Sequence, residues 1–391
     1  MQKLLIAITV ILLFGCKTEK PSEPLQEIVI DFSKSEKVVD ISDVIDSTFF
    51  KIVALETNAN SLIGEIDKIF YQNQRIYIVD KMQKCIIVFD DEGRFLFKLH
   101  KPGRGAGEYT EIQTATVTPD NIIVVDMGKR VALFYDLEGN YQRDIDMSKL
   151  WCYELISFND ESLYYVNNLS SSASGHFLLF QTDTMGKELR PFMPFKGEEC
   201  NRGWGMDNNH SKYGDSVYVV YGSMDSIFYF SKSEAMHPKY RIQYAGAKMP
   251  DYLKYGDGSK AVYAYIAQTG SDNSYTMGAK AIVHLPDDLL LKFDNGQHYC
   301  ARYNKTTGSV ALGYDLKILS FPYRPATGLT VQGNYAVNWL PAKSFKYFWT
   351  FEYNKIEYRN AAFGERMRQL RDSATDMDNP IVFIFRINAT K

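Results

Sequence analysis

The sequence predicts an all-β protein made of repeated antiparallel sheets, and two observations lead to that prediction. First, the segments 75–99 (RIYIVDKMQKCIIVFDDEGRFLFKL) and 121–145 (NIIVVDMGKRVALFYDLEGNYQRDI) share one pattern of apolar positions. Three pairs of anchor residues, all with the same spacing, align the two copies: Asp80 with Asp126, Asp90 with Asp136, and Gly93 with Gly139. Second, 27 Tyr and 24 Phe with little helix-period patterning favour strands. A repeat of this length is typical of a propeller blade.

Each copy of the repeat is interpreted as three consecutive strands. In the first copy, one β-rich run ends at Asp80, a second ends at Asp90, and an Asp-x-x-Gly turn leads into a third. Aspartate hydrogen-bonds its own backbone in such turns, and glycine supplies the positive φ angle. Because one small sheet cannot bury both faces alone, the units must stack until the ring closes. The stretch from 64 to 353 has room for six units, so we expect a six-bladed β-propeller.

The later blades are predicted from shorter apolar runs and turns. Their expected positions are 155–194 for blade three, 216–221 and 226–230 in blade four, 289–293 and 299–303 in blade five, and 329–349 for blade six. Closing a ring requires a strand near one terminus to complete a blade whose other strands come from the part of the chain near the opposite terminus. The two candidates for this closing strand are 49–55 and 381–385.

The first residues predict an exported, lipid-anchored protein. Lys3 precedes an apolar run that is too short to span a bilayer, as in a signal peptide. The run ends in Leu13-Phe14-Gly15-Cys16, which resembles the lipobox of bacterial lipoproteins, so we expect lipidation of Cys16. The alternative is an ordinary signal peptide cut near Gly15. The predicted organisation is 1–16 signal peptide and lipobox, 17–38 flexible tether, and 39–391 propeller.

Composition and cysteine content limit the remaining possibilities. A net charge of −3 provides no basic surface for nucleic acid. Four cysteines follow Cys16 and permit two disulfides in three pairings. However, Cys85 aligns with an apolar strand position of the second copy, Val131, which favours the role of a small buried side chain. These cysteines, none of which has metal-site spacing, are Cys85, Cys152, Cys200 and Cys300.

Several short motifs resemble those of the six-bladed β-propeller lipoproteins of Gram-negative gut anaerobes, distant relatives of NHL-repeat propellers. The motifs are Leu55-Glu56-Thr57, Leu62-Ile63-Gly64, the glycine-rich segment 103–109 (GRGAGEY) and Asp378-Asn379-Pro380, besides the paired repeats. Ala106 stands where the family usually has proline. The resemblance covers nearly the whole mature chain. It implies the fold and a location in the cell envelope, as an outer-membrane lipoprotein facing the periplasm or the surface, and it implies no settled activity.

Three residues are candidate ligand contacts. The glycine-rich segment is interpreted as a turn between blades, because a phosphate loop needs a helix behind it and a strand follows here. If the segment instead bound an anion, Arg104 would be the contact, and we include Tyr109 beside it. Two apparent insertions, 197–215 and 270–280, are longer than a connection between strands requires and are therefore candidate functional loops. Trp204, between two glycines, could stack on a sugar or anchor a partner.

Near the C-terminus the segment 361–371 (AAFGERMRQLR) predicts a short helix. Phe363, Met367 and Leu370 fall on one face, and three arginines lie off it. We favour packing of this face on the propeller rim over binding of a partner.

No local catalytic motif is present: the six histidines lack HxH and HExxH spacing, and no GxSxG sequence occurs. Asp80 and Asp126 are interpreted as turn residues, with a calcium or catalytic role as the alternative. We therefore expect no cofactor, with structural or catalytic calcium left open. Two functions remain: a non-catalytic envelope module that binds a glycan, peptide or protein, or a propeller hydrolase or lyase acting on a sugar or lactone, with a metal in the channel as one option.

Overall fold

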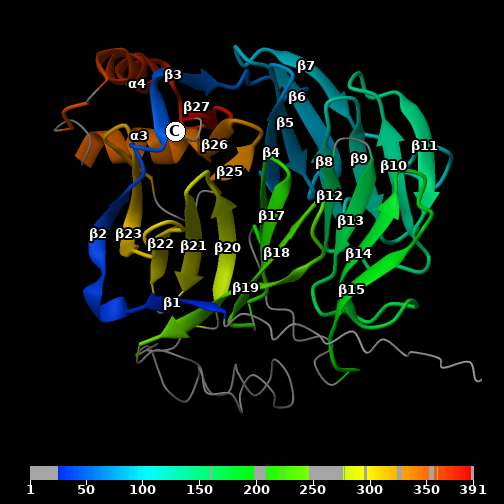
Figure 1. Ribbon diagram of the computed structural model, residues 1–391. Helices are drawn as coiled ribbons and strands as arrows, with labels where there is room; N and C mark the ends of the chain where they lie inside the picture. Colours follow the sequence, from blue (N-terminus) through cyan, green and yellow to red (C-terminus); the bar gives the residue numbers. More distant parts are fainter. Residues whose placement is uncertain are drawn as a thin grey trace, which may run out of the picture.

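Six sheets, antiparallel except where an N-terminal strand is added to two of them, radiate from a common centre in the computed structural model (Figure 1). The structure describes residues 25–158, 161–197, 208–222, 224–245, 276, 278–294, 297–323, 328–351, 356–358 and 360–388. In three sheets the strands follow one another outward from the centre in chain order, and in the other three a strand from the N-terminal part of the chain is added at the outer end. The chain is therefore the six-bladed β-propeller that the repeat predicts.

The blades are numbered here from the first complete repeat. Blade 1 contains β4 (Lys68–Gln72), β5 (Arg75–Asp80), β6 (Cys85–Asp90) and β7 (Phe95–Leu99). Blade 2 contains β8 (Thr114–Val117), β9 (Ile122–Asp126), β10 (Val131–Tyr135) and β11 (Tyr141–Asp146). Blade 3 contains β12 (Glu154–Phe158), β13 (Ser162–Val166), β14 (Phe177–Asp183) and β15 (Arg190–Pro194).

The second half of the ring also uses the N-terminal strands. Blade 4 contains β16 (His210–Tyr213), β17 (Ser216–Val220), β18 (Ser226–Ser231), β19 (His237–Tyr244) and, outermost, β1 (Gln26–Ile30). Blade 5 contains β20 (Ala279–His284), β21 (Asp288–Asp294), β22 (His298–Asn304), β23 (Val310–Ile318), β24 (Phe321–Tyr323) and β2 (Glu36–Asp40). Blade 6 contains β25 (Thr330–Gln332), β26 (Tyr335–Leu340), β27 (Ile381–Ile387) and β3 (Ile45–Ala54).

The repeated Asp-x-x-Gly turn has the predicted mechanism. Asp90 Oδ1 accepts hydrogen bonds from the backbone N–H of Glu92 (3.1 Å) and Arg94 (2.8 Å), and Gly93 has a φ of +88°. Asp136 and Gly139 repeat this geometry in blade 2, with a φ of +83°. A third copy follows at Asp183, which accepts from two amides in the same way. A short polar side chain and a residue without Cβ therefore fix these hairpins locally.

The hydrophobic core lies between neighbouring blades. One cluster joins Ile76, Ile78, Ile87 and Phe89 of blade 1 to Val337, Val382 and Ile384 of blade 6. Because each central strand is covered on both faces, it is a continuous apolar run: Ile76 to Val79 are all 0% exposed. The fold therefore depends on stacking of one blade on the next around the ring.

The two predicted closing strands pair directly with each other. β27 and β3 are antiparallel, with Phe383 opposite Ile52, so the N-terminal strand completes a blade otherwise built from the C-terminal part. The buried Asn379 secures this closure: its Nδ2 donates to the carbonyls of Glu56 (2.7 Å) and Ser61 (2.8 Å), and its Oδ1 accepts from Ile63 N–H (3.0 Å). Motifs that lie more than 300 residues apart in sequence thus form one closure.

The prediction of a flexible tether over 17–38 is wrong for its C-terminal part. β1 pairs in parallel with β19 of blade 4, and β2 pairs in parallel with β23 of blade 5. Ile28, Ile30 and Val39 are at most 1% exposed. The polar composition around these strands suggested a linker, but their alternating apolar residues bury one face against the rim of the ring.

Two helices are inserted between β26 and β27, and the first of them replaces the end of the blade structure that the sequence predicted up to residue 349. They are α3 (Ala342–Phe351) and α4 (Ala361–Ser373), which lie beside blade 6 (Figure 1). α4 is the predicted C-terminal helix. Its face of Phe363, Met367 and Leu370 is buried, and Phe363 makes an edge contact with Phe50 of β3. The favoured interpretation, packing on the rim, is confirmed.

Candidate binding site at the channel entrance

The innermost strands of the six blades all begin at the same face of the ring, which we call the entry face. Each blade receives its chain there from the outer strand of the preceding blade, and the turns between second and third strands lie at the same face, as at Asp80–Cys85. The first residues of these inner strands therefore surround the entrance of the central channel.

Three polar side chains from blades 1, 2 and 3 meet at this entrance. Lys68 Nζ donates to Thr114 Oγ1 (2.8 Å) and forms an ion pair with Glu154 Oε2, to which Thr114 Oγ1 also donates (2.7 Å). Each is the first residue of its inner strand. Because blade 2 lies between blades 1 and 3, the contact between Lys68 and Glu154 passes in front of the inner strand of blade 2, where Thr114 bonds to both.

The charges at the entrance are largely shielded from water. The side chain of Glu154 is 7% exposed and that of Lys68 is 17% exposed. Burial alone would raise the pKa of Glu154, but the nearby positive charge of Lys68 and the hydrogen bonds from Lys68 and Thr114 hold that pKa below its usual value. Glu154 is therefore an ionised carboxylate with two fixed donors at neutral pH.

His210 begins the inner strand of blade 4 and extends the cluster. Its surroundings lower its pKa to about 4, chiefly through burial, which the charge of Glu154 opposes. The imidazole is thus neutral at pH 7. Its Nδ1 lies 3.2 Å from Asn209 Oδ1, consistent with a tautomer in which Nδ1 carries the hydrogen and Nε2 is an acceptor.

Two further polar groups at the entrance lack a partner. Asn209 is 1% exposed and its Nδ2 has no hydrogen-bond acceptor in the described part of the chain, and Thr330 Oγ1 of blade 6 is likewise buried and unpaired. Buried polar groups are normally paired, so unpaired donors beside an ion pair indicate room for hydrogen bonds to another molecule. The entrance therefore combines a carboxylate, an ammonium group, a neutral imidazole and spare donors.

The glycine-rich segment forms a turn between blades 1 and 2. Gly105 N–H donates to Glu108 Oε2 (2.8 Å), and Lys129 Nζ donates to the carbonyls of Gly105 and Glu108. The Glu108 carboxylate thus already accepts from the Gly105 amide, which an anion bound to this segment would need as a donor. Arg104 is exposed on this turn. Tyr109 is 0% exposed and its hydroxyl donates to the carbonyls of Lys84 and Leu99 (both 3.0 Å), so we do not include it in the candidate site.

The two predicted insertions are in part inner strands. β16 lies within 197–215, and β20 begins inside 270–280. The sequence HSKY of β16 has no apolar alternation, because its side chains make polar contacts with both neighbouring blades: Ser211 Oγ accepts from His284 N–H of blade 5, and Lys212 Nζ donates to the Ser157 carbonyl of blade 3. For this reason the sequence alone suggested a loop. Trp204 and Cys16 lie outside the described residues.

Asp80 and Asp126 have the structural role that was favoured. Asp80 Oδ2 accepts from Gly64 N–H (2.8 Å), and Asp126 Oδ2 accepts from Thr110 N–H (2.6 Å) at the equivalent position of the next blade. Each buried carboxylate thereby ties an incoming loop to its turn. Within the described ranges, no group of three or more His, Cys, Asp or Glu side chains is placed to hold a metal ion.

Three cysteines are buried and not in disulfides: Cys85, Cys152 and Cys300. Burial raises the pKa of the Cys85 thiol to about 11 and that of Cys300 to about 12. They behave as small apolar side chains, as the repeat alignment favoured for Cys85. Cys200 lies outside the described residues.

Sequence reasoning missed the cluster of Lys68, Thr114, Glu154 and His210. These residues are spread over more than 140 positions and form no motif. One signal was available: Lys68 and Thr114 have the same spacing as the repeat anchors, which marks both as first residues of inner strands. The partners in blades 3 and 4 do not keep that spacing.

The geometry defines a six-bladed propeller with a polar, partly unsatisfied channel entrance. The chain belongs to a family described as a domain of unknown function (DUF4934), whose model matches residues 27–386. No curated protein matches significantly. The family resemblance inferred from the motifs is confirmed at the level of a six-bladed propeller family of unknown function.

Solved structures support the fold. A crystal structure from Bacteroides fragilis, described as a "putative exported protein", is 17% identical, with a TM-score of 0.68 over 93% of this chain and 100% of that one. A DUF4221 member from Bacteroides vulgatus is 11% identical, covers 89% of this chain and 98% of that chain, and has a TM-score of 0.49. A virginiamycin B lyase from Staphylococcus aureus is 10% identical, covers 82% and 80%, and has a TM-score of 0.40. The last two likenesses are too distant to support any functional argument.

Proposed function

We propose that this protein is a lipid-anchored, non-catalytic binding module of the Gram-negative cell envelope, whose channel entrance holds a glycan, peptide or protein partner. The observation that carries the proposal is the convergence of Lys68, Thr114, Glu154 and His210 from four blades on one opening. A buried ion pair gains little stability over apolar side chains of similar size, so a purely structural role explains it poorly. Unpaired donors at Asn209 and Thr330 support hydrogen bonding to a bound molecule.

The test is a thermal-shift measurement on a soluble form that begins at Lys17 and so retains every described strand. The probe is a pool of neutral and acidic oligosaccharides from partial hydrolysis of plant and bacterial polysaccharides. A ligand at 100 times its Kd adds about 2.7 kcal/mol, which raises the Tm of a chain of this size by about a degree or more.

Lys68→Met tests the site, and Arg190→Gln is the control, because Arg190 lies on the outer edge of blade 3 with a side chain 64% exposed. We expect the ligand-induced shift to persist in the control and to disappear in Lys68→Met, whatever the starting Tm of each variant. A shift retained in Lys68→Met means that the ligand binds elsewhere. No shift with any fragment contradicts the glycan form of the proposal, and co-purification of a protein partner becomes the next measurement.

Envelope anchoring is proposed from the lipobox-like sequence ending at Cys16 and the short polar stretch before β1. The similar Bacteroides fragilis protein, described as exported, is consistent with it. Within the described residues, no helix is long and apolar enough to span a bilayer. Detergent phase partitioning of the full chain and of Cys16→Ser tests the anchor. Equal partitioning of both into the aqueous phase refutes it.

The alternative is a hydrolase or lyase acting on a sugar or lactone. It is favoured by one observation: a neutral His210 close to the ionised Glu154 resembles an acid–base pair. Turnover of the same oligosaccharide pool, measured with and without a metal chelator, separates the two functions. Product that forms in the wild-type protein and is lost in His210→Gln supports the enzyme.

A further inference from the structure

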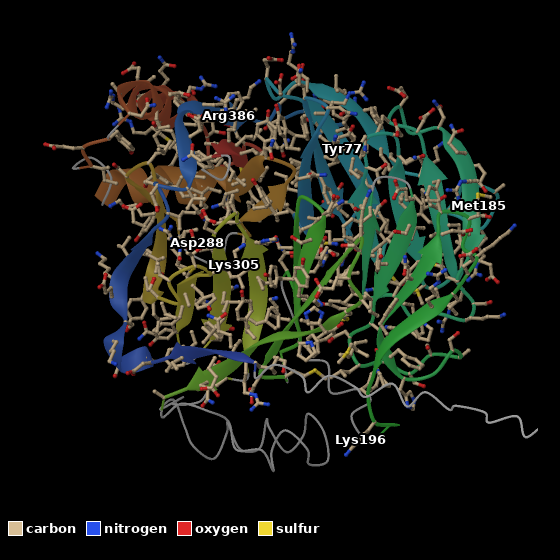
Figure 2. The ribbon with its side chains drawn as sticks, in the orientation of Figure 1. Tyr77, Met185, Lys196, Asp288, Lys305 and Arg386 are labelled. Carbon is tan, nitrogen blue, oxygen red and sulfur yellow. The ribbon has the colours of Figure 1, made fainter. Side chains whose placement is uncertain are left out.

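A second cluster lies at the opposite end of blade 5 from the channel entrance. β20 ends at His284 and β22 ends just before Lys305, so both residues lie at the face where inner strands finish. Lys305 Nζ is 3.0 Å from His284 Nε2 and donates to the Leu285 carbonyl (2.9 Å). Figure 2 labels Lys305 and Asp288 close to each other in this blade.

Among the described residues, Lys305 has no carboxylate as a hydrogen-bond or ion-pair partner. The nearest buried carboxylate, Asp288, already accepts from Arg302 Nη2 (2.8 Å) and Asn304 Nδ2 (3.1 Å). Arg302 in turn pairs with Asp43. The other nearby acid, Asp287, is exposed and accepts the backbone N–H of Lys305 through its carbonyl (2.8 Å). The amine is therefore held in place by a carbonyl and an imidazole rather than by an opposite charge.

The groups from blade 4 that face the amine are also uncharged. The Tyr218 ring centroid lies 5.8 Å from Lys305 Nζ, and Tyr213 and Tyr218 both contact the His284 ring by their edges. His284 is 3% exposed, and its Nδ1 has no hydrogen-bond partner among the described residues. Burial and the charge of Lys305 lower the His284 pKa to about 3, so the imidazole is neutral.

A neutral environment favours the neutral amine. Burial lowers the pKa of Lys305 to about 8, against the opposing charges of Asp287 and Asp288. Lys305 is nevertheless only partly buried, at a turn. A desolvated lysine without a carboxylate partner is the usual environment of a nucleophilic lysine.

We propose that Lys305 is a covalent modification site that reacts with small aldehydes, because its amine is hydrogen-bonded to the neutral His284 and the Leu285 carbonyl and has no carboxylate partner in the described part of the chain. The neutral amine adds to the carbonyl carbon, a C=N bond replaces the C=O bond, and the oxygen leaves as water with the two amine hydrogens. No oxidant or reductant is required for this imine. The site is at the other face from the proposed ligand site and does not depend on it.

The test compares Lys305 with an ordinary lysine in the same full-length molecule. The protein is treated with glycolaldehyde and sodium cyanoborohydride, which traps the imine, at pH 7, 8, 9 and 10, and the modified peptides are counted by mass spectrometry. Lys34, whose side chain is 82% exposed, is the reference. Since a solvated lysine titrates near 10.4, the neutral fraction of Lys305 is on the order of 100 times larger at pH 7 to 8. A less basic amine is also a weaker nucleophile, so we expect Lys305 to be modified on the order of tenfold faster.

The pH profile is the decisive readout. The advantage of Lys305 should shrink by pH 10, where solvated lysines also lose their protons. His284→Glu provides a second measurement, because a carboxylate beside Nζ stabilises the ammonium form and should move the profile of Lys305 toward higher pH. Modification of Lys305 at the same rate as Lys34, or more slowly at every pH, overturns the proposal. A profile that rises in parallel with that of Lys34 does so as well.

Discussion

Replacement of Ile30 by alanine tests whether the N-terminal segment is part of the propeller. Ile30 ends β1, is 0% exposed, and belongs to the cluster that joins blades 4 and 5. Its neighbour Val29 points outward and is 52% exposed. The two substitutions remove similar side chains from adjacent positions of one strand, so they differ mainly in burial.

The expected cost follows from that difference. Truncating a buried isoleucine to alanine costs about 2–5 kcal/mol, and an edge strand can relax, so we expect about 3 kcal/mol for Ile30→Ala. Val29→Ala should stay within about 0.5 kcal/mol. With an m-value of roughly 3 kcal/mol/M, the first substitution lowers the urea midpoint by about 1 M.

The assay is urea unfolding followed by tryptophan fluorescence and by circular dichroism, with both variants and the wild type measured together. Equal midpoints for Ile30→Ala and Val29→Ala would refute the reasoning. That result would mean that β1 does not pack on β19 in solution and that residues 17–38 form a flexible tether, as the sequence predicts.

Three other sets of substitutions test the turns, the closure and a buried histidine. Gly214→Ala should cost about 1 kcal/mol for its φ of +58° alone, whereas Gly93→Ala should cost roughly 3 kcal/mol or more, because the new Cβ would lie 2.3 Å from the Ala54 carbonyl oxygen; similar urea midpoints would contradict this. Asn379→Ala removes three hydrogen bonds from the closure, although the Glu56 carbonyl keeps the Ser61 hydroxyl as a donor, and should cost roughly 2–4 kcal/mol by thermal unfolding; Asn379→Asp, which keeps only the acceptor, should fall between it and the wild type. Because the pKa of His284 is lowered in the folded chain, the unfolded chain binds a proton at this residue at a pH where the folded chain does not. The free energy of unfolding should therefore fall as pH drops from about 6.5 toward 3. The fall between pH 7 and 5 should be smaller in His284→Gln, and an unchanged fall would show that His284 is not the buried neutral group described.

Much of the fold could be predicted because its signals are local. The Asp-x-x-Gly turns at Asp90 and Asp136 depend on side-chain-to-backbone bonds within four residues, and a short window of sequence contains them completely. The helix over 361–371 was equally accessible, since Phe363, Met367 and Leu370 repeat at helical spacing. The blade count followed from a spacing that the first two blades keep.

The sequence by itself determined the repeat, the turns, the six-blade ring and the two strands that close it, because each depends on short-range periodicity or on the length of chain per blade. Only the tertiary structure decided that β1 and β2 extend blades 4 and 5, that HSKY is an inner strand, and that Lys68, Glu154 and His210 share one opening. These features depend on which distant strands become neighbours. A polar inner strand or a short edge strand gains its stability from those neighbours, so its own residues carry too little pattern to reveal it.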